Sequence, residues 1–80
     1  MPDKLMRSAR LVGMKQTLRA LETASVEAVY IAQDADQAVV RPIIEGCKEL
    51  GVNVVYVETM AELGRACQID VGAAVACILK

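Results

Sequence analysis

The sequence predicts an α/β fold: a single-domain, three-layer α-β-α sandwich with a mixed four-stranded sheet. Short, almost wholly apolar runs of strand length alternate along the chain with segments whose apolar residues recur at helical spacing. Apolar residues make up 55% of the 80 residues, which is enough to build one modest core. Because no internal repeat or linker interrupts the chain, residues 1–80 are expected to form one domain.

The first elements are expected on either side of a glycine. Residues 3–10 favour a short amphipathic helix, and residues 11–12 favour a brief strand that leads to Gly13. A helix is predicted over residues 15–24, since the apolar positions of this region fall on one side of a helix. That side consists of Met14, Thr17, Leu18, Leu21 and Ala24.

Three apolar runs predict the other strands. Residues 28–32 have the length and composition of a strand that is covered on both faces, and residues 52–57 form a second apolar strand. Residues 73–79 are apolar throughout, a pattern that a strand and a buried helix share. Their small number favours a strand.

Pro42 divides the second helical region. Apolar residues recur at helical spacing on both sides of it, namely Val39, Val40, Ile43, Ile44, Cys47 and Leu50. A proline inside a helix costs about 3 kcal/mol, whereas the first helical position favours it. We therefore expect a helix over residues 42–50 that Gly51 caps, with a separate turn at residues 37–40 before it. A further turn is expected at residues 34–36, whose aspartates shape the turn and cap helices.

The last predicted helix has a distinctive start. Thr59 and Glu62 have the spacing of a capping box, in which the threonine caps the helix and the glutamate reaches back. The helix is expected to end at about Ala66 or Cys67. Residues 68–72 are then expected to form a loop.

Residue usage argues against enzyme chemistry. The chain has no histidine, the commonest general base and metal ligand, and only two serines, Ser8 and Ser25. Its three cysteines are an odd number at wide spacings, which argues against a disulfide framework and a zinc site. We expect Cys47, Cys67 and Cys77 to be small buried residues. No catalytic residue, metal or cofactor is expected.

The chain shows no membrane or targeting segment. No apolar run approaches the roughly 20 residues that a membrane span needs. The first residues lack the apolar region of a signal peptide. A cytoplasmic protein is therefore expected.

The charges are unevenly distributed along the chain, although the net charge is only −1. Residues 1–20 carry five basic residues and one acidic residue, whereas residues 21–80 carry four basic and nine acidic ones. A basic region of this kind can attract a polyanion, because local potential steers binding while net charge governs solubility. Charge alone is equally consistent with a solvated basic helix face.

The stretch from Gly13 to Arg19 is the most informative part of the sequence. Lys15 and Arg19 stand four residues apart, hence on one face of the predicted helix. The start of a helix presents unpaired backbone N–H groups and the positive end of the helix dipole. Since no acidic residue lies in this turn, the stretch predicts an anion-binding surface.

Three segments, spread in order over nearly the whole chain, carry a resemblance to a known family. They are GMKQTLRAL at residues 13–21, IAQDAD at residues 31–36 with Pro42 six residues further on, and LGRACQIDVGAA at residues 63–74. Together they resemble the kink-turn-binding ribosomal proteins of the large subunit, the L-seven-Ae and L-thirty-e superfamily. The similarity is strongest to its short bacterial members.

The resemblance implies an α-β-α sandwich that binds RNA without enzymatic activity. The RNA of this family is a kinked helix in which tandem sheared G·A pairs lie beside a bulge, in ribosomal RNA or structured messenger RNA. The start of the second helix enters the major groove, and a hydrophobic loop covers the bulged bases. The resemblance thus implies RNA as partner, and neither DNA nor a membrane, and we expect a monomer.

The resemblance also assigns residues by motif position. Those that would face the G·A pairs and the nearby phosphates are Gly13, Met14, Lys15, Gln16 and Arg19. Those of the covering loop would be Ile69, Asp70, Val71 and Gly72. The chain departs from the pattern at Lys15-Gln16, where many archaeal members carry asparagine and glutamate. A neutral glutamine accepts from a guanine edge less strongly than a glutamate, which predicts weaker base specificity.

Several alternatives stay open at this point. Ile69 and Val71 could point into the core where the last strand begins, and Gly64 and Gly72 could serve packing alone. Arg65 could reach a phosphate from the neighbouring helix. A rival function is a small α/β regulatory domain that binds a phosphorylated metabolite at the helix start, or a protein partner through the apolar loop.

Overall fold

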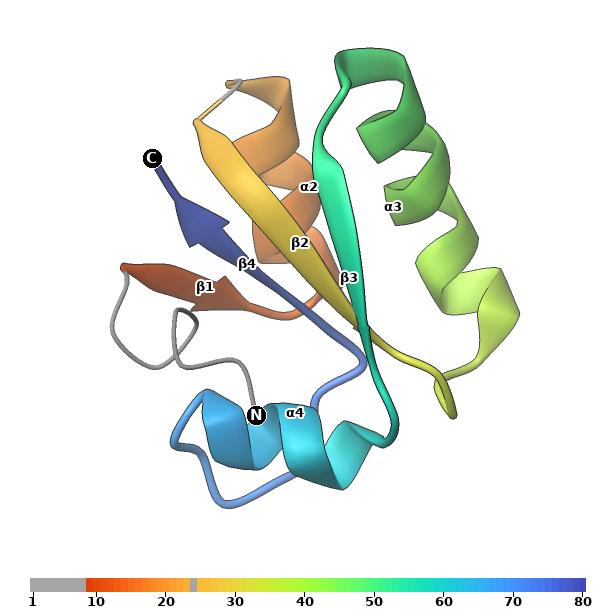
Figure 1. Ribbon diagram of the computed structural model, residues 1–80, viewed down its shortest axis with the longest axis vertical. Helices are drawn as coiled ribbons and strands as arrows, with labels where there is room; N and C mark the ends of the chain where they lie inside the picture. Colours follow the sequence, from red (N-terminus) through yellow and green to blue (C-terminus); the bar gives the residue numbers. More distant parts are fainter. Residues whose placement is uncertain (1–8, 24) are drawn as a thin grey trace.

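The computed structural model describes residues 9–23 and 25–80, which form three helices and a four-stranded sheet (Figure 1). In chain order the elements are β1 (Arg10–Val12), α2 (Met14–Glu22), β2 (Val26–Ala32), α3 (Gln37–Leu50), β3 (Asn53–Val57), α4 (Met60–Ala66) and β4 (Val75–Leu79). The helix expected over residues 3–10 lies mostly outside the described residues. Arg10, expected at its end, begins β1 instead, because it pairs with Ile78 of β4.

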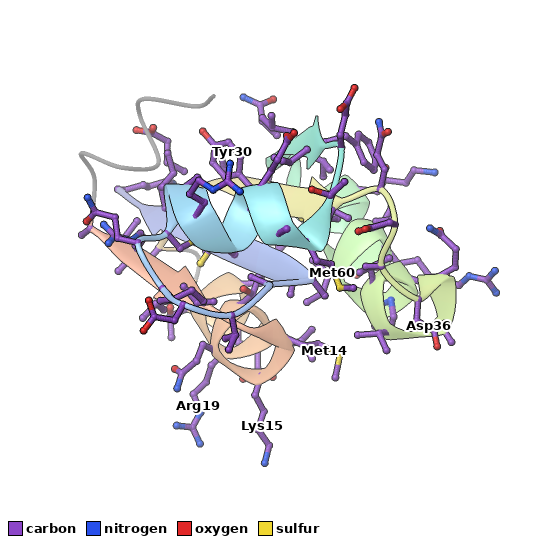
Figure 2. The ribbon with its side chains drawn as sticks, turned by 90° about the horizontal axis from the view of Figure 1, so that it is seen from below. Met14, Lys15, Arg19, Tyr30, Asp36 and Met60 are labelled. Carbon is purple, nitrogen blue, oxygen red and sulfur yellow. The ribbon has the colours of Figure 1, made fainter. Side chains whose placement is uncertain are left out.

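The sheet is mixed, and its strands lie in the order β1-β4-β2-β3. The strand β4 runs antiparallel to both β1 and β2, whereas β3 runs parallel to β2. Figure 2 shows α4 on one face of the sheet and α2 and α3 on the other. The predicted three-layer sandwich with a mixed four-stranded sheet is therefore confirmed.

The last strand lies inside the sheet and forms the centre of the core. Residues 75–78 of β4 have no exposed surface at all. The apolar run at residues 73–79 is thus a strand, as its length predicts, although the strand itself begins at Val75. The other two predicted strands are observed within two residues of their expected limits, at residues 26–32 and 53–57.

The turn predicted at residues 37–40 is wrong, since α3 runs without a break from residue 37 to residue 50. Asp36 begins this helix, because its carboxylate accepts a hydrogen bond of 2.9 Å from the backbone N–H of Ala38. Gly51 ends the helix as predicted, with a left-handed backbone and its N–H donated to the carbonyl of Cys47.

Burial explains why Pro42 does not break α3. A proline six residues into the helix removes one intrahelical bond, the one that its nitrogen would donate to the carbonyl of Ala38. The apolar stripe of the helix crosses the proline, and Val40, Ile43 and Cys47 are buried almost completely. The contacts of this stripe with the sheet and with α2 offset the cost of the proline.

The helices α2 and α4 begin where the sequence places them. The Oγ1 of Thr59 accepts a hydrogen bond of 3.0 Å from the N–H of Glu62, which is the threonine half of the predicted capping box. Thr17 and Leu21 lie on the buried side of α2 as expected. Met14 does not, because its side chain points away from the sheet at the start of the helix and is 38% exposed (Figure 2).

The three cysteines, Cys47, Cys67 and Cys77, are buried and free, as the sequence predicts. Burial raises the pKa of each thiol above its ordinary value, which keeps the side chains neutral. Within residues 9–23 and 25–80, no group of three or more cysteine, aspartate and glutamate side chains could hold a metal ion. None of the helices in these same residues is long and apolar enough to cross a membrane.

We expect Pro42→Ala to stabilise the protein by about 1–3 kcal/mol, because alanine restores the missing N–H and removes the ring from the helix. Equilibrium unfolding in urea measures the difference. Arg41→Ala is the matched control, since Arg41 is an exposed neighbour in the same helix and its loss should change little. Unchanged or reduced stability of the Pro42 variant would contradict a continuous α3.

Candidate nucleic-acid interface

The start of α2 is tied directly to the central strand. Gly13 donates its backbone N–H to the carbonyl of Val75 over 2.9 Å, and its own carbonyl accepts from the N–H of Thr17 over 3.1 Å. The φ of Gly13 is 107°, a conformation that side-chain-bearing residues rarely adopt. The space where a side chain would stand is open. A ligand can therefore approach the backbone closely at this point.

Lys15, Gln16 and Arg19 form the polar part of the candidate site. All three side chains are exposed, and together they line a shallow hollow of about 130 Å³ on the outer side of α2. Figure 2 shows Lys15 and Arg19 pointing away from the sheet on the same side of the helix. No acidic residue lies in the first turn, so the two cations and the helix dipole act with the same sign. The arrangement suits an anion.

The loop between α4 and β4 supplies the apolar part. Val71 is 70% exposed and Ile69 is 36% exposed, while Asp70 and Gly72 are exposed as well. The alternative in which both apolar side chains enter the core is therefore wrong for Val71. An apolar side chain this exposed can gain burial from a partner with an apolar surface, such as a nucleobase.

This loop is packed tightly against α4. A side chain on Gly64 would overlap the carbonyl of Val71, so the loop lies directly on the helix backbone. Backbone hydrogen bonds of 3.0 Å run from Ile69 N–H to the carbonyl of Gly64 and from Ala73 N–H to the carbonyl of Met60. Gly64 thus has a clear packing role, as one of the sequence alternatives proposed, and the loop has a defined shape.

Asp34 caps the start of α4, the helix against which the loop packs. Its carboxylate accepts a hydrogen bond of 2.8 Å from the backbone N–H of Met60, the first residue of α4. The sequence predicts a turn and a cap for this residue, and the cap is confirmed. The helix that it caps begins 26 residues away, and only the folded structure identifies it.

The two parts of the candidate site lie at one end of the sandwich. Seen from below, the segment that joins α4 to β4 crosses between α4 and the start of α2 (Figure 2). The bond from Gly13 to Val75 holds the beginning of β4 against the beginning of α2. Met14 and Met60 lie on the same side of the molecule and are both about two-fifths exposed, at 38% and 37%. The cations of α2, its first backbone N–H groups and the apolar loop therefore lie at one end of the molecule.

A comparison with known families bears on the fold. A sequence profile of the ribosomal protein L7Ae/L30e/S12e/Gadd45 family matches residues 2–80. The chain belongs to this family. The resemblance inferred from the three sequence motifs is therefore confirmed, and the four-stranded sandwich is a fold of the L7Ae family.

Relatives of this L7Ae-family chain occur in bacteria, archaea and a eukaryote. It is 57% identical over 67 residues to an RNA-binding protein of Caldanaerobacter subterraneus, covering 84% of this chain and 82% of that one. It is 35% identical over 68 residues to the large ribosomal subunit protein eL8 of Halobacterium salinarum, covering 84% of this chain and 57% of that one. The solved 15.5kD RNA binding protein of Giardia lamblia superposes with a TM-score of 0.91 at 30% identity, covering 98% of this chain and 69% of that one.

We expect Gly64→Ala to destabilise the protein by roughly 1–3 kcal/mol, because the added methyl group forces the loop backbone away from α4. Gly46→Ala is the matched control in the interior of α3. There the added methyl would meet only the Leu21 side chain at an ordinary 3.6 Å, and the better helix former should stabilise by up to about 1 kcal/mol. Urea unfolding measures both, and equal effects of the two changes would contradict the close packing of the loop.

Proposed function

We propose that this member of the L7Ae family is a non-enzymatic RNA-binding protein that recognises and stabilises kink-turns in ribosomal RNA or in structured messenger RNA. It would do so in the cytoplasm and as a monomer. The observation that carries the proposal is that the exposed Lys15, Gln16 and Arg19 of α2 and an exposed apolar loop lie at one end of the sandwich. The relatives named RNA-binding proteins and the ribosomal protein eL8 support it.

The electrostatics of α2 suit a kinked RNA. A sharp kink brings phosphates of two strands close together, and their repulsion opposes the bend. Lys15, Arg19 and the uncapped N–H groups at the start of α2 offset this repulsion when they bind there. A regular RNA helix has a major groove too narrow for a protein helix, whereas a kink opens it. The protein is therefore expected to prefer bent RNA to straight RNA.

Gly13 would allow a close fit to the RNA, and Gln16 would contact a base edge. The open space at Gly13 lets an RNA edge approach the backbone. The exposed amide of Gln16 offers one acceptor and two donor hydrogens to a base edge. Because this amide is neutral, it discriminates between bases less strongly than a carboxylate would.

The apolar loop would cover the bulged bases. Val71 and Ile69 have exposed apolar surface that a splayed base can bury. Asp70 stands between them and would act through its backbone, since its carboxylate is repelled by phosphate. The loop would thereby add a contribution to the free energy of RNA binding that does not depend on salt.

The rival interpretation, a regulatory domain for a phosphorylated metabolite, fits the site less well. The hollow beside Lys15 and Arg19 has about 130 Å³, whereas pockets for such ligands usually have about 300–1,000 Å³. A shallow surface suits contact with a macromolecule better than it suits a small ligand, which needs an enclosing pocket. Thermal-shift screening of nucleotides against a kink-turn RNA separates the two functions.

The proposal predicts that a kink-turn RNA binds far more tightly than a straight duplex of equal length. The duplex keeps the number of phosphates but lacks the bulge and the sheared G·A pairs, so only the general attraction remains. Gel-shift titration at several salt concentrations measures both affinities, which should fall as salt rises. Equal binding of the two RNAs would refute the proposal.

Lys15→Ala should weaken binding to the kink-turn RNA by roughly 1–3 kcal/mol and reduce its dependence on salt. Lys48→Ala is the control, because Lys48 is also an exposed lysine and lies in the last turn of α3, outside the candidate site. It should change the affinity little. Equal losses from the two substitutions would mean that the RNA binds on another face.

A further inference from the structure

Arg10 joins the two halves of the candidate site. It is the first residue of β1, the strand that leads into Gly13 and the start of α2. Its Nε and Nη2 donate to the carbonyl of Cys67 over 3.1 Å and 2.8 Å. Its Nη2 also donates to the Oε1 of Gln68 over 3.1 Å. A residue from one end of the chain thus holds the end of α4 and the first residue of the loop.

The position that Arg10 holds is a strained one. Gln68 has a φ of 63°, the only left-handed backbone at a residue other than glycine in the described part of the chain. Residues with a Cβ disfavour this conformation, so surrounding contacts must maintain it. The chain reverses here, with the N–H of Gln68 donated to Arg65 and that of Ile69 donated to Gly64. The direction of the following loop depends on this reversal.

The donors of Arg10 are directed into the protein. Its side chain is half-buried, in contrast to Lys15 and Arg19, which are exposed and project from α2. The carbonyl of Cys67 lies at the end of α4, where unpaired carbonyl groups and the helix dipole favour a cation. The planar guanidinium satisfies this carbonyl and the amide of Gln68 at once, a geometry that an ammonium group does not match.

We propose that Arg10 is a positioning residue for RNA binding. It maintains the left-handed turn at Gln68 and so holds Ile69 and Val71 in the arrangement that receives RNA. This inference rests on the proposed function of the surface. A loop that is already ordered spares the RNA the entropic cost of ordering it, which strengthens binding without a direct contact.

The test compares Arg10→Met and Arg10→Lys with the natural protein in binding to kink-turn RNA. A loop that holds the binding conformation about one tenth of the time lowers the apparent affinity about tenfold. Both variants should show a loss of this order, while the dependence of affinity on salt stays the same. Hydrogen exchange at the Ile69 amide should become faster in both, since its bond to Gly64 depends on the turn.

A second substitution tests the route of the effect. Asparagine adopts the left-handed backbone more readily than glutamine, so Gln68→Asn should recover part of the affinity lost in Arg10→Met. Gln68→Val keeps Arg10 in place and disfavours the turn, because valine is β-branched. If the Arg10 variants fail to fold, Gln68→Val still tests the role of the turn, because it should weaken RNA binding.

Four results would overturn the inference. A salt dependence reduced by one phosphate contact in Arg10→Met would mean that Arg10 touches RNA directly. If Arg10→Met, or Arg10→Lys alone, bound RNA as tightly as the natural protein, the hydrogen bonds from the guanidinium to Cys67 and Gln68 would not be needed. No recovery with Gln68→Asn would mean that Arg10 acts elsewhere, and natural affinity in Gln68→Val would mean that the turn is not needed. Failure of the natural protein to distinguish kink-turn from duplex would instead refute the proposed function itself.

Discussion

The burial of β4 is the constraint on which the rest of the structure depends. Residues 75–78 have no exposed surface, so this strand needs partners at both edges and cover on both faces. The strands β1 and β2 supply the edges, and α2 and α4 supply the cover. Because the apolar loop directly precedes β4 and β1 directly precedes Gly13, the pairing of these two strands brings the loop to the start of α2. The candidate interface is therefore a consequence of how the core forms.

Most of the fold follows from local patterns in the sequence. Runs of apolar residues predict β2 and β4 because strands covered on both faces have few polar positions. The run at β3 is recognised by its β-branched and aromatic residues, although this edge strand is mostly exposed. Helix starts are visible where a cap uses neighbouring residues, as with Thr59 and Glu62. The prediction is wrong at Pro42, because the propensity of one residue is weaker than the tertiary burial of the stripe that crosses it.

The candidate site is predictable in part. The spacing of Lys15 and Arg19 places them on one face, and both are exposed on that face. Two side-chain contacts at this end of the molecule have no local signal, because each acts across a long stretch of sequence. Arg10 contacts Cys67 and Gln68, which lie 57 and 58 positions further along the chain. Asp34 caps a helix that begins 26 positions further along the chain. In the sequence Arg10 is one more basic residue of a basic region, and only the pairing of β1 with β4 gives it a defined partner.

In the proposed function, the start of α2 and the loop after α4 form one RNA-binding surface. Titration of isotope-labelled protein with kink-turn RNA, followed by the amide signals in NMR spectra, tests it most directly. We expect the amides at residues 13–19 and 69–72 to shift together at the same RNA concentration. Those of β3 and the end of α3, at the far edge of the sheet, should stay in place. Shifts centred on β3 and the end of α3, or on only one of the two segments, would contradict it.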